Sequence, residues 1–251
     1  MDRSKIHSAA KLLAKSRQEG RFVQELPEKL KPATFADAAA IQTETAHILD
    51  EPIVAYKVSG VDPAQVIWGA ILGSRFLQHP AQLPAADVPL LGVEAEIAYL
   101  LKRDVEAGDR ALTIEQFDEM TSVVPAIEIV DSRFLSYTAA PAMDRNADFM
   151  SNGALVVGDP WPESVETDFP TLRVGLSNGD QILAEAEGGH SAGDPRLPAL
   201  AFLRAPHRPD HLPAGTVITT GTLTGLKYVQ PGDTVTASFA GYGTLEIAFT
   251  T

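Results

Sequence analysis

The stretch Gly92-Val93-Glu94-Ala95-Glu96-Ile97-Ala98-Tyr99-Leu100-Leu101 decides how the rest of the chain is interpreted. It is mostly apolar, which predicts a buried strand. Glu94 and Glu96 are two positions apart, so they share one face of that strand, with Cα atoms roughly 7 Å apart. Burying both carboxylates costs several kcal/mol unless a positive charge lies between them. Two interpretations stay open from this stretch: a divalent cation with oxygen ligands, or a solvated strand face with two surface glutamates.

A second apolar stretch, residues 122–130, also predicts a buried strand, and it carries Glu128 in its interior. Two neighbouring strands would bring Glu94, Glu96 and Glu128 to one point. Three carboxylates, with water or substrate in the remaining positions, suit Mg²⁺ or Mn²⁺ rather than Zn²⁺. The second strand therefore favours the metal interpretation.

Lys57 lies in the middle of the β-rich run 53–58, on the same strand face as Ile53 and Ala55. Lysine is rarely fully buried without a partner. One interpretation is an edge-strand lysine that extends its ammonium to solvent. The other is a lysine directed at an anionic ligand or engaged in proton transfer.

The composition limits the classes of protein to consider. The chain has 251 residues, 45% hydrophobic and 21% charged, as in soluble globular proteins. A net charge of −13 argues against nucleic acid or an anionic membrane as a partner. The absence of cysteine excludes disulfides, thiolate nucleophiles and zinc–sulfur sites. Because neither a secretory signal nor a spanning apolar segment is visible, we expect a cytoplasmic location.

The order of expected elements predicts an α+β fold. Residues 3–19 and 34–49 predict helices, and residues 64–78 are expected to be irregular because Gly69 and Gly73 interrupt them. Three prolines between residues 80 and 89 mark a loop. We therefore expect a smaller N-terminal α/β part, residues 1–85, and a β-rich body, residues 86–251. Within the body, the sequence predicts strands at 153–158, 172–176, 181–184, 216–220, 233–239 and 244–249, and one short helix within 195–204.

Other motifs of catalysis are missing or weak. The sequence contains no Gly-x-Ser-x-Gly elbow, no Gly-x-Gly-x-x-Gly turn and no phosphate loop, which leaves serine hydrolase and dinucleotide-binding interpretations without support. His190 lies in the glycine-rich segment Gly188-Gly189-His190-Ser191. A structural or solvent-facing histidine is favoured there over a base or a metal ligand.

Several segments, in order along almost the whole chain, resemble a known family. They resemble the 2-keto-4-pentenoate hydratase / 4-oxalocrotonate decarboxylase family, which is part of the fumarylacetoacetate hydrolase superfamily. The segments are Tyr56-Lys57-Val58, the Glu94 and Glu96 strand, Val124-Pro125-Ala126-Ile127-Glu128-Ile129-Val130-Asp131-Ser132-Arg133, Ala147-Asp148-Phe149-Met150-Ser151, Thr219-Thr220-Gly221-Thr222 and Pro231-Gly232-Asp233.

The resemblance implies a mixed β-roll body with a smaller N-terminal α/β part, assembled into a homo-oligomer. It implies Mg²⁺ or Mn²⁺ held by Glu94, Glu96 and Glu128, with a small 2-oxo acid as substrate. Lys57 matches a lysine that contacts the substrate and helps to move protons. In the same way, Ser151 matches a serine that lines the substrate site, and Thr222 is a weaker match to a substrate-binding residue.

The resemblance implies a metal-dependent lyase of aromatic catabolism that acts on 2-hydroxy-2,4-dienoic or 2-oxo-4-enoic acids. Hydration is the favoured reaction. Ile67 departs from the pattern, because the hydratases carry an aspartate there and the decarboxylases an apolar residue. Asp148 is retained, but Phe149 and Met150 differ from the pattern. The alternatives are a 4-oxalocrotonate-type decarboxylase, an acylpyruvate-type C–C hydrolase and a non-catalytic relative.

Overall fold

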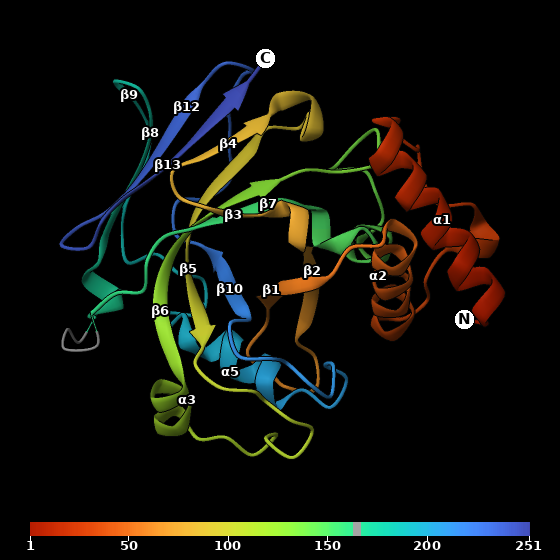
Figure 1. The fold of residues 1–251 in the computed structure, drawn as a ribbon, viewed down its shortest axis with the longest axis horizontal. Coiled ribbons are helices and arrows are strands. Elements are labelled where there is room, and N and C mark those ends of the chain that lie inside the picture. The colour runs from red at the N-terminus through yellow and green to blue at the C-terminus, as the bar shows by residue number, and fades with distance from the viewer. Residues whose placement is uncertain (163–166) are drawn as a thin grey trace.

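A computed structural model describes residues 1–162 and 167–251, and its larger sheet carries the predicted glutamate strands (Figure 1). This sheet has the order β2-β1-β10-β5-β6-β7-β3, with β11 paired to β5. Its strands are β1 (Ile53–Ser59), β2 (Ile67–Leu72), β3 (Phe76–Gln78), β5 (Gly92–Leu101), β6 (Thr121–Val130), β7 (Asn152–Val157), β10 (Val217–Thr222) and β11 (Lys227–Tyr228).

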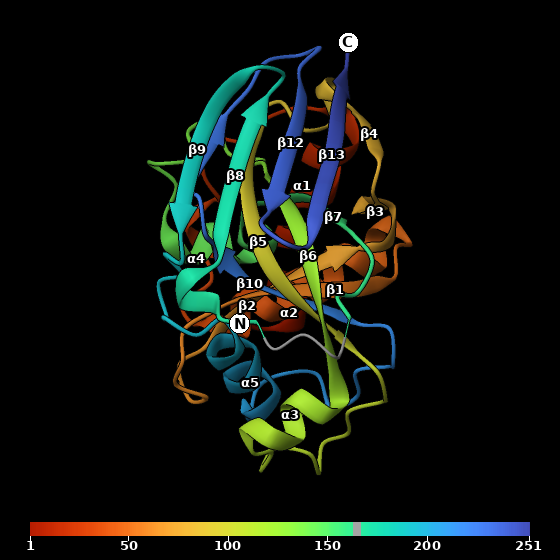
Figure 2. The same cartoon turned by 90° about the vertical axis from the view of Figure 1, so that its left-hand side faces the viewer.

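The smaller sheet packs across the larger one, and Figure 2 shows it in front of β5 and β6. It contains β4 (Ala81–Pro84), β8 (Arg173–Asn178), β9 (Gln181–Glu187), β12 (Thr234–Phe239) and β13 (Gly243–Thr250), in the order β4-β13-β12-β8-β9. One apolar core includes side chains of both sheets, among them Val93, Ile97, Val235 and Ile247, all fully buried. Because side chains alternate along β5, its other face is free to carry the two glutamates.

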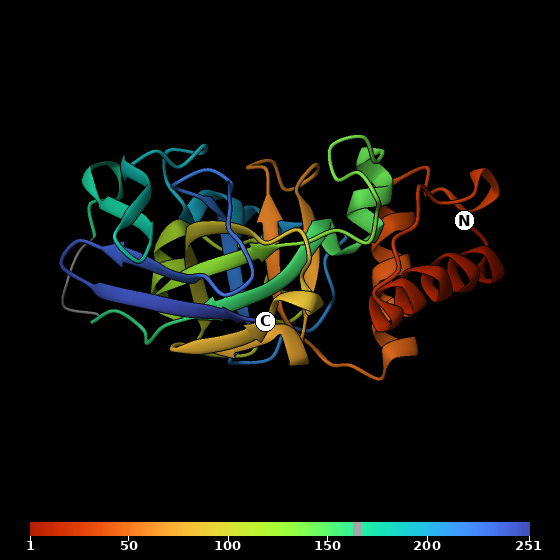
Figure 3. The same cartoon turned by 90° about the horizontal axis from the view of Figure 1, so that it is seen from above.

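Helices α1 (Arg3–Glu19) and α2 (Phe35–Leu49) pack against each other at one end of an elongated molecule (Figure 3). A capping box between Thr34 and Asp37 starts α2. The remaining α-helices of the described residues are α3 (Ile114–Met120), α4 (Ala142–Ala147) and α5 (Arg196–Arg204). No helix in the described ranges combines the length and the apolarity needed to cross a membrane.

The predicted α+β class is confirmed, but the expectation of an irregular segment at residues 64–78 is wrong. Part of that segment forms β2, which is buried along almost its whole length, and part forms β3. A strand that is buried on both faces has no apolar–polar alternation, so its sequence gives no period-two signal. The predicted boundary at residue 85 stays a prediction, although β1 to β4, from its N-terminal side, are hydrogen-bonded into the two sheets.

Gly69 on β2 packs against an unusual turn, and we expect its replacement by alanine to destabilise the protein by about 1–3 kcal/mol. A Cβ at this position would lie 2.4 Å from the carbonyl oxygen of Phe149. That carbonyl cannot retreat easily, because Phe149, Met150 and Ser151 all have left-handed backbone conformations, with φ of 54°, 51° and 59°.

Chemical denaturation of Gly69→Ala checks this expectation. Gly108→Ala is the matched control, because a Cβ on Gly108 has no atom within 4 Å, and it should change the stability by less than about 0.5 kcal/mol. Equal stability of the two variants would contradict the close packing of β2 on the turn.

Candidate metal and substrate site

The three predicted glutamates converge on one point of the larger sheet. Glu94 and Glu96 share one face of β5, and the antiparallel register places Glu128 of β6 directly opposite Glu94. One carboxylate oxygen from each of the three residues lies within 4.8 Å of the others. The structure therefore brings Glu128 together with two glutamates that precede it by more than thirty residues in the sequence.

Burial makes this group of carboxylates electrostatically costly. Glu96 and Glu128 are each 1% exposed, and Glu94 is half-buried. Burial, followed by the charge of Glu128, raises the pKa of Glu94 to about 7. The same two causes raise the pKa of Glu96 well above its ordinary value. A positive charge among the three would relieve both shifts.

Lys57 supplies part of that charge. Its Nζ lies 2.5 Å from Oε1 of Glu128, and its side chain is only 15% exposed, so it does not extend to solvent. Burial alone would lower the pKa of Lys57, but the carboxylates of Glu128, Glu96 and Glu94 outweigh burial and raise this pKa. Three carboxylates against one ammonium leave two negative charges, which is the charge that a divalent cation balances.

The hydrogen bonds to Glu96 and Glu128 leave room for a cation. Oε1 of Glu128 accepts from Lys57 and, at 3.1 Å, from Nδ2 of Asn152. Oε2 of Glu96 accepts from Oγ1 of Thr219 and, at 3.3 Å, from the backbone nitrogen of Gly221. Among the described residues, these donors engage one oxygen of each carboxylate, so the second oxygen is available as a ligand. The donor set, all hard oxygens, fits Mg²⁺ or Mn²⁺.

A cleft of about 760 Å³ opens over the carboxylates, and Lys57 and Thr222 line it as predicted residues of the substrate site. Thr222 also hydrogen-bonds Glu94. Ser151 does not line this cleft: its Oγ is buried and has no hydrogen-bond partner, while the neighbouring Met150 lines the wall. The role of Ser151 in substrate binding therefore stays a prediction.

His190 has the structural position that the sequence favoured. Its Nε2 lies 2.8 Å from the carbonyl oxygen of Thr220, and its Nδ1 accepts from the backbone nitrogen of Ala192. Burial lowers the pKa of this imidazole. A neutral ring with a proton on Nε2 satisfies both contacts, so His190 fixes the loop beside the cleft.

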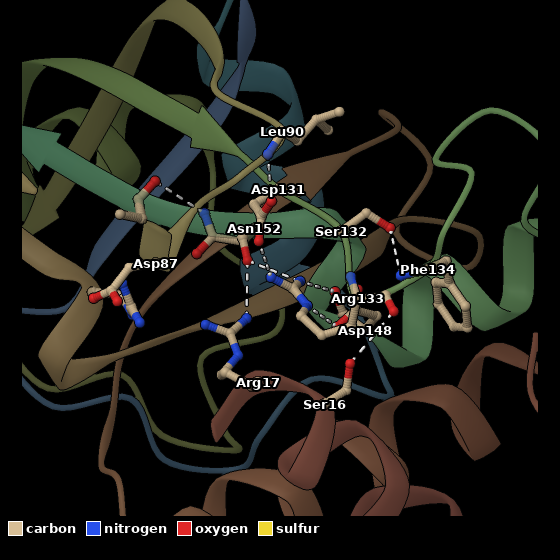
Figure 4. Close-up of polar contacts among 12 residues, drawn as sticks. Ser16, Arg17, Asp87, Leu90, Asp131, Ser132, Arg133, Phe134, Asp148 and Asn152 are labelled. Carbon is tan, nitrogen blue, oxygen red and sulfur yellow. Dashed lines mark hydrogen bonds and ion pairs between the residues drawn. The ribbon is translucent and has the colours of Figure 1, made fainter. Parts of the chain in front are cut away.

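A buried ion network surrounds Arg133, next to the Asn152 that binds Glu128 (Figure 4). Nε of Arg133 donates to Asp148 at 2.6 Å, and its NH1 donates to Asp131 at 3.1 Å. Its NH2 donates to the backbone carbonyl of Asn152, which also accepts from Arg17 of α1 at 3.0 Å. The retained Asp148 therefore holds Arg133, which in turn binds the backbone carbonyl of Asn152.

Sequence reasoning missed Asn152 and Thr219 as partners of the carboxylates. Thr219 had a signal, because it lies in the Thr-Thr-Gly-Thr motif of the resemblance. Asn152 had none, since its contact with Glu128 depends on a turn that no local pattern predicts. Ile67, which departs from the pattern, is the first residue of β2 and pairs with Ser59.

Comparison with known proteins agrees with this fold. Residues 73–250 match the family described as fumarylacetoacetate (FAA) hydrolase C-terminal, so the chain belongs to the fumarylacetoacetate hydrolase family. It is 26% identical to a 4-oxalocrotonate decarboxylase of Pseudomonas putida, over 99% of this chain and 98% of that protein. It is 28% identical to a 2-keto-4-pentenoate hydratase of Burkholderia vietnamiensis, over 99% of both chains.

The solved structure of a 4-oxalocrotonate decarboxylase from Pseudomonas putida G7 superimposes with a TM-score of 0.85 at 22% identity, covering 99% of this chain and 98% of that one. This likeness extends through the N-terminal helices as well as the sheets. The family resemblance seen in the sequence is confirmed.

Mg²⁺ is expected to stabilise the protein more at about pH 8 than at about pH 5. The pKa of Glu94 is raised from 4.5 to about 7 on folding. The stability from its protonated form is therefore complete below pH 4.5 and is lost as the pH rises through about 7. Because Mg²⁺ binds the ionised carboxylates, protons compete with it at the lower pH.

Thermal unfolding with and without saturating Mg²⁺, at both pH values, measures the difference in Tm. Using the difference at each pH removes the background acid sensitivity of the chain. Glu94→Gln should weaken the dependence but not remove it, because Glu96, whose pKa is also raised, still titrates. A Tm increment independent of pH in the unmodified protein would count against Mg²⁺ binding at these carboxylates.

Asn152→Ala is expected to weaken Mg²⁺ binding by about 10–100-fold, because the amide that orients Glu128 is lost. The backbone carbonyl of residue 152 stays available to Arg17 and Arg133, so the fold should persist. Calorimetric titration with Mg²⁺ measures the affinity, and unfolding in chelator measures the fold. Asn178→Ala, in the β8–β9 hairpin, is the control; equal Mg²⁺ affinity of the two variants would refute the orienting role.

Proposed function

We propose that the protein is a divalent-metal-dependent lyase that acts on 2-hydroxy-2,4-dienoic or 2-oxo-4-enoic acids, with hydration as its reaction. The convergence of three buried carboxylates and Lys57 beneath an open cleft carries the proposal. Full-length similarity to proteins named 2-keto-4-pentenoate hydratase supports the reaction class. The proposal includes a role in aromatic catabolism.

Glu94, Glu96 and Glu128 would hold Mg²⁺ or Mn²⁺. Solved structures of a 4-oxalocrotonate decarboxylase are described as complexes with magnesium or calcium, which supports a divalent cation here. When bound, such a cation supplies Lewis-acid stabilisation of the negative charge that develops on the 2-oxygen of the substrate.

Proton transfer and access for water are the other requirements of the reaction, and residues of the cleft can meet both. Lys57 is held protonated by its acidic neighbours, so it can neutralise an enolate or return a proton to it. Hydration moves a proton from the 2-hydroxyl to carbon and then adds water across the remaining double bond. The open cleft above Lys57 and Thr222 gives water access to the distal carbon.

A decarboxylase is the second candidate, and two observations favour it. The identity to a named 4-oxalocrotonate decarboxylase, 26%, is close to the 28% for the hydratase. Ile67 also takes the place of the aspartate expected in hydratases. Loss of CO₂ would use the same enolate stabilisation, so the carboxylates and Lys57 serve both reactions. An acylpyruvate-type hydrolase and a non-catalytic relative have less support.

Incubation of the Mg²⁺-loaded protein with 2-hydroxypenta-2,4-dienoate, with 4-oxalocrotonate and with an acylpyruvate separates these candidates. We expect loss of the dienoate absorbance with formation of a 4-hydroxy-2-oxo acid. Lys57→Met is the control for a contaminating enzyme, because activity of the protein itself should fall by about 10²–10⁴-fold. Conversion of none of the three substrates would refute the proposal.

The proposal also covers the location, the oligomeric state and the partners of the protein. We propose a cytoplasmic homo-oligomer that binds a small 2-oxo acid and neither nucleic acid nor membrane. The net charge of −13 supports the exclusion of polyanionic partners. Gel filtration with light scattering tests the oligomeric state.

A further inference from the structure

The cleft above the three glutamates is charged at its floor, and its exposed rim is uncharged, with two serines beside two apolar side chains. Glu96 and Glu128 at the floor are each 1% exposed. Two side chains of the cleft wall are much more exposed, Val61 at 55% and Leu197 at 40%. An acid whose head group lies at the floor would therefore extend its tail toward side chains that carry no charge.

Positive charge is confined to the floor. In residues 1–162 and 167–251, Lys57 is the one basic side chain that lines the cleft, and it is bonded to Glu128. The wall between floor and rim adds the side chains of Met150, Tyr137 and Pro198, which carry no charge at neutral pH. A second carboxylate on the substrate would meet no cation along this wall.

Two arginines adjoin the walls, and both are engaged by other groups. Arg145 lies over the ring of Tyr137, 5.5 Å from its centroid, and donates to the carbonyl oxygen of that residue. Arg196, the neighbour of Leu197, binds both carboxylate oxygens of Asp194. It also donates a hydrogen bond to Asp118 of α3. Neither guanidinium lines the cleft.

We infer that the substrate is an acid with a single carboxylate and an uncharged tail, rather than a dicarboxylic acid. The inference rests on the proposed function and narrows its substrate class. Three carboxylates, one ammonium and one divalent cation sum to zero, so a bound monoacid leaves one negative charge and a diacid leaves two. Val61 and Leu197 gain contact with an alkyl or alkenyl tail, whereas a terminal carboxylate at the rim would lose water without gaining a cation.

Binding, rather than turnover, distinguishes the two classes. A leaving carboxylate in an apolar environment loses CO₂ more readily, so a diacid could react well even where it binds poorly. The comparison matters because the solved decarboxylase is described as a complex with adipate, which is a dicarboxylate. Unreactive saturated 2-oxo acids isolate the binding step.

Calorimetric titration of the Mg²⁺-loaded protein with 2-oxohexanoate and with 2-oxohexanedioate tests the inference. The two acids share their head group and carbon number and differ in one terminal group. We expect the monoacid to bind at least about tenfold more tightly. Equal or tighter binding of the diacid would overturn the inference, whereas binding of neither acid would overturn the proposed function and this inference with it.

A variant that adds a cation at the rim sharpens the result. Leu197→Arg is expected to improve diacid binding by about fivefold or more and to change monoacid binding little. Ile182→Arg is the matched control, because Ile182 is 64% exposed on β9 and does not line the cleft, so both affinities should stay unchanged. If Leu197→Arg left the ratio of affinities unchanged, the tail would not reach this rim and the inference would fail.

Discussion

Glu96→Gln is expected to abolish turnover and to weaken Mg²⁺ binding by more than about 100-fold, which exceeds the loss expected for a residue that only orients a ligand. The substitution removes an anionic oxygen from the group of three carboxylates while keeping the shape of the side chain. Thr219 and Gly221 can still donate to the amide oxygen. Glu94→Gln and Glu128→Gln should also lose activity, although Glu128→Gln additionally leaves Lys57 without its ion pair.

The same variant should be more stable than the unmodified protein in the presence of a chelator. Burial and repulsion by Glu128 and Glu94 raise the pKa of Glu96, so its ionised form is destabilised when no cation is bound. Glutamine resembles the protonated form and removes this repulsion. Loss of activity with a gain of metal-free stability would separate a functional carboxylate from one that supports the fold.

Calorimetry with Mg²⁺, a turnover assay and unfolding in chelator measure the three effects. Glu246→Gln is the matched control, since Glu246 is a strand glutamate on the exposed face of β13. It should leave all three quantities unchanged. A Glu96→Gln protein that binds Mg²⁺ and turns over substrate normally would place the site elsewhere.

Arg133→Met is expected to destabilise the protein by about 3–5 kcal/mol, because it leaves two buried carboxylates without their cation. Asp131 and Asp148 are 3% and 1% exposed, and Arg133 is 4% exposed. Burial raises the pKa of Asp148, and the arginine is what opposes that shift. The left-handed turn and Asn152 lose an anchor at the same time.

Chemical denaturation measures this loss, and Arg103→Met is its control. Arg103 pairs with Asp109 near the surface, so the control should lose less than about 1 kcal/mol. Adding Asp148→Asn to Arg133→Met should recover part of the stability, because one of the two unpaired charges is removed. Equal stability of the two single arginine variants would show that the buried network contributes nothing.

The parts of the site that lie on regular strands were predictable from the sequence. Alternation along β5 and β6 fixes which side chains share a face, so Glu94, Glu96 and Glu128 could be placed together before the fold was known. Lys57 followed from its position inside an apolar strand. The family resemblance then supported the metal interpretation and related the segments to one another along the chain.

The parts that depend on tertiary packing were not predictable. β2 was expected to be irregular because a doubly buried strand shows no alternation. Ser151 was expected in the cleft, but three consecutive left-handed residues put Met150 there. Asn152 reaches Glu128 only because of the same turn. Positive φ at ordinary residues is held by surrounding contacts, and a single sequence does not display those contacts.

The carbonyl oxygen of Asn152 accepts hydrogen bonds from Arg17 and Arg133, and its side chain orients Glu128. Arg17 of the first helix therefore contacts the residue that orients Glu128, even though this helix lies at one end of the molecule (Figure 3). A shortened chain that begins after this helix would lose one of the two guanidinium groups at that junction. For this reason an engineered form of the enzyme should keep the N-terminal helix, because its removal would disturb the position of Asn152.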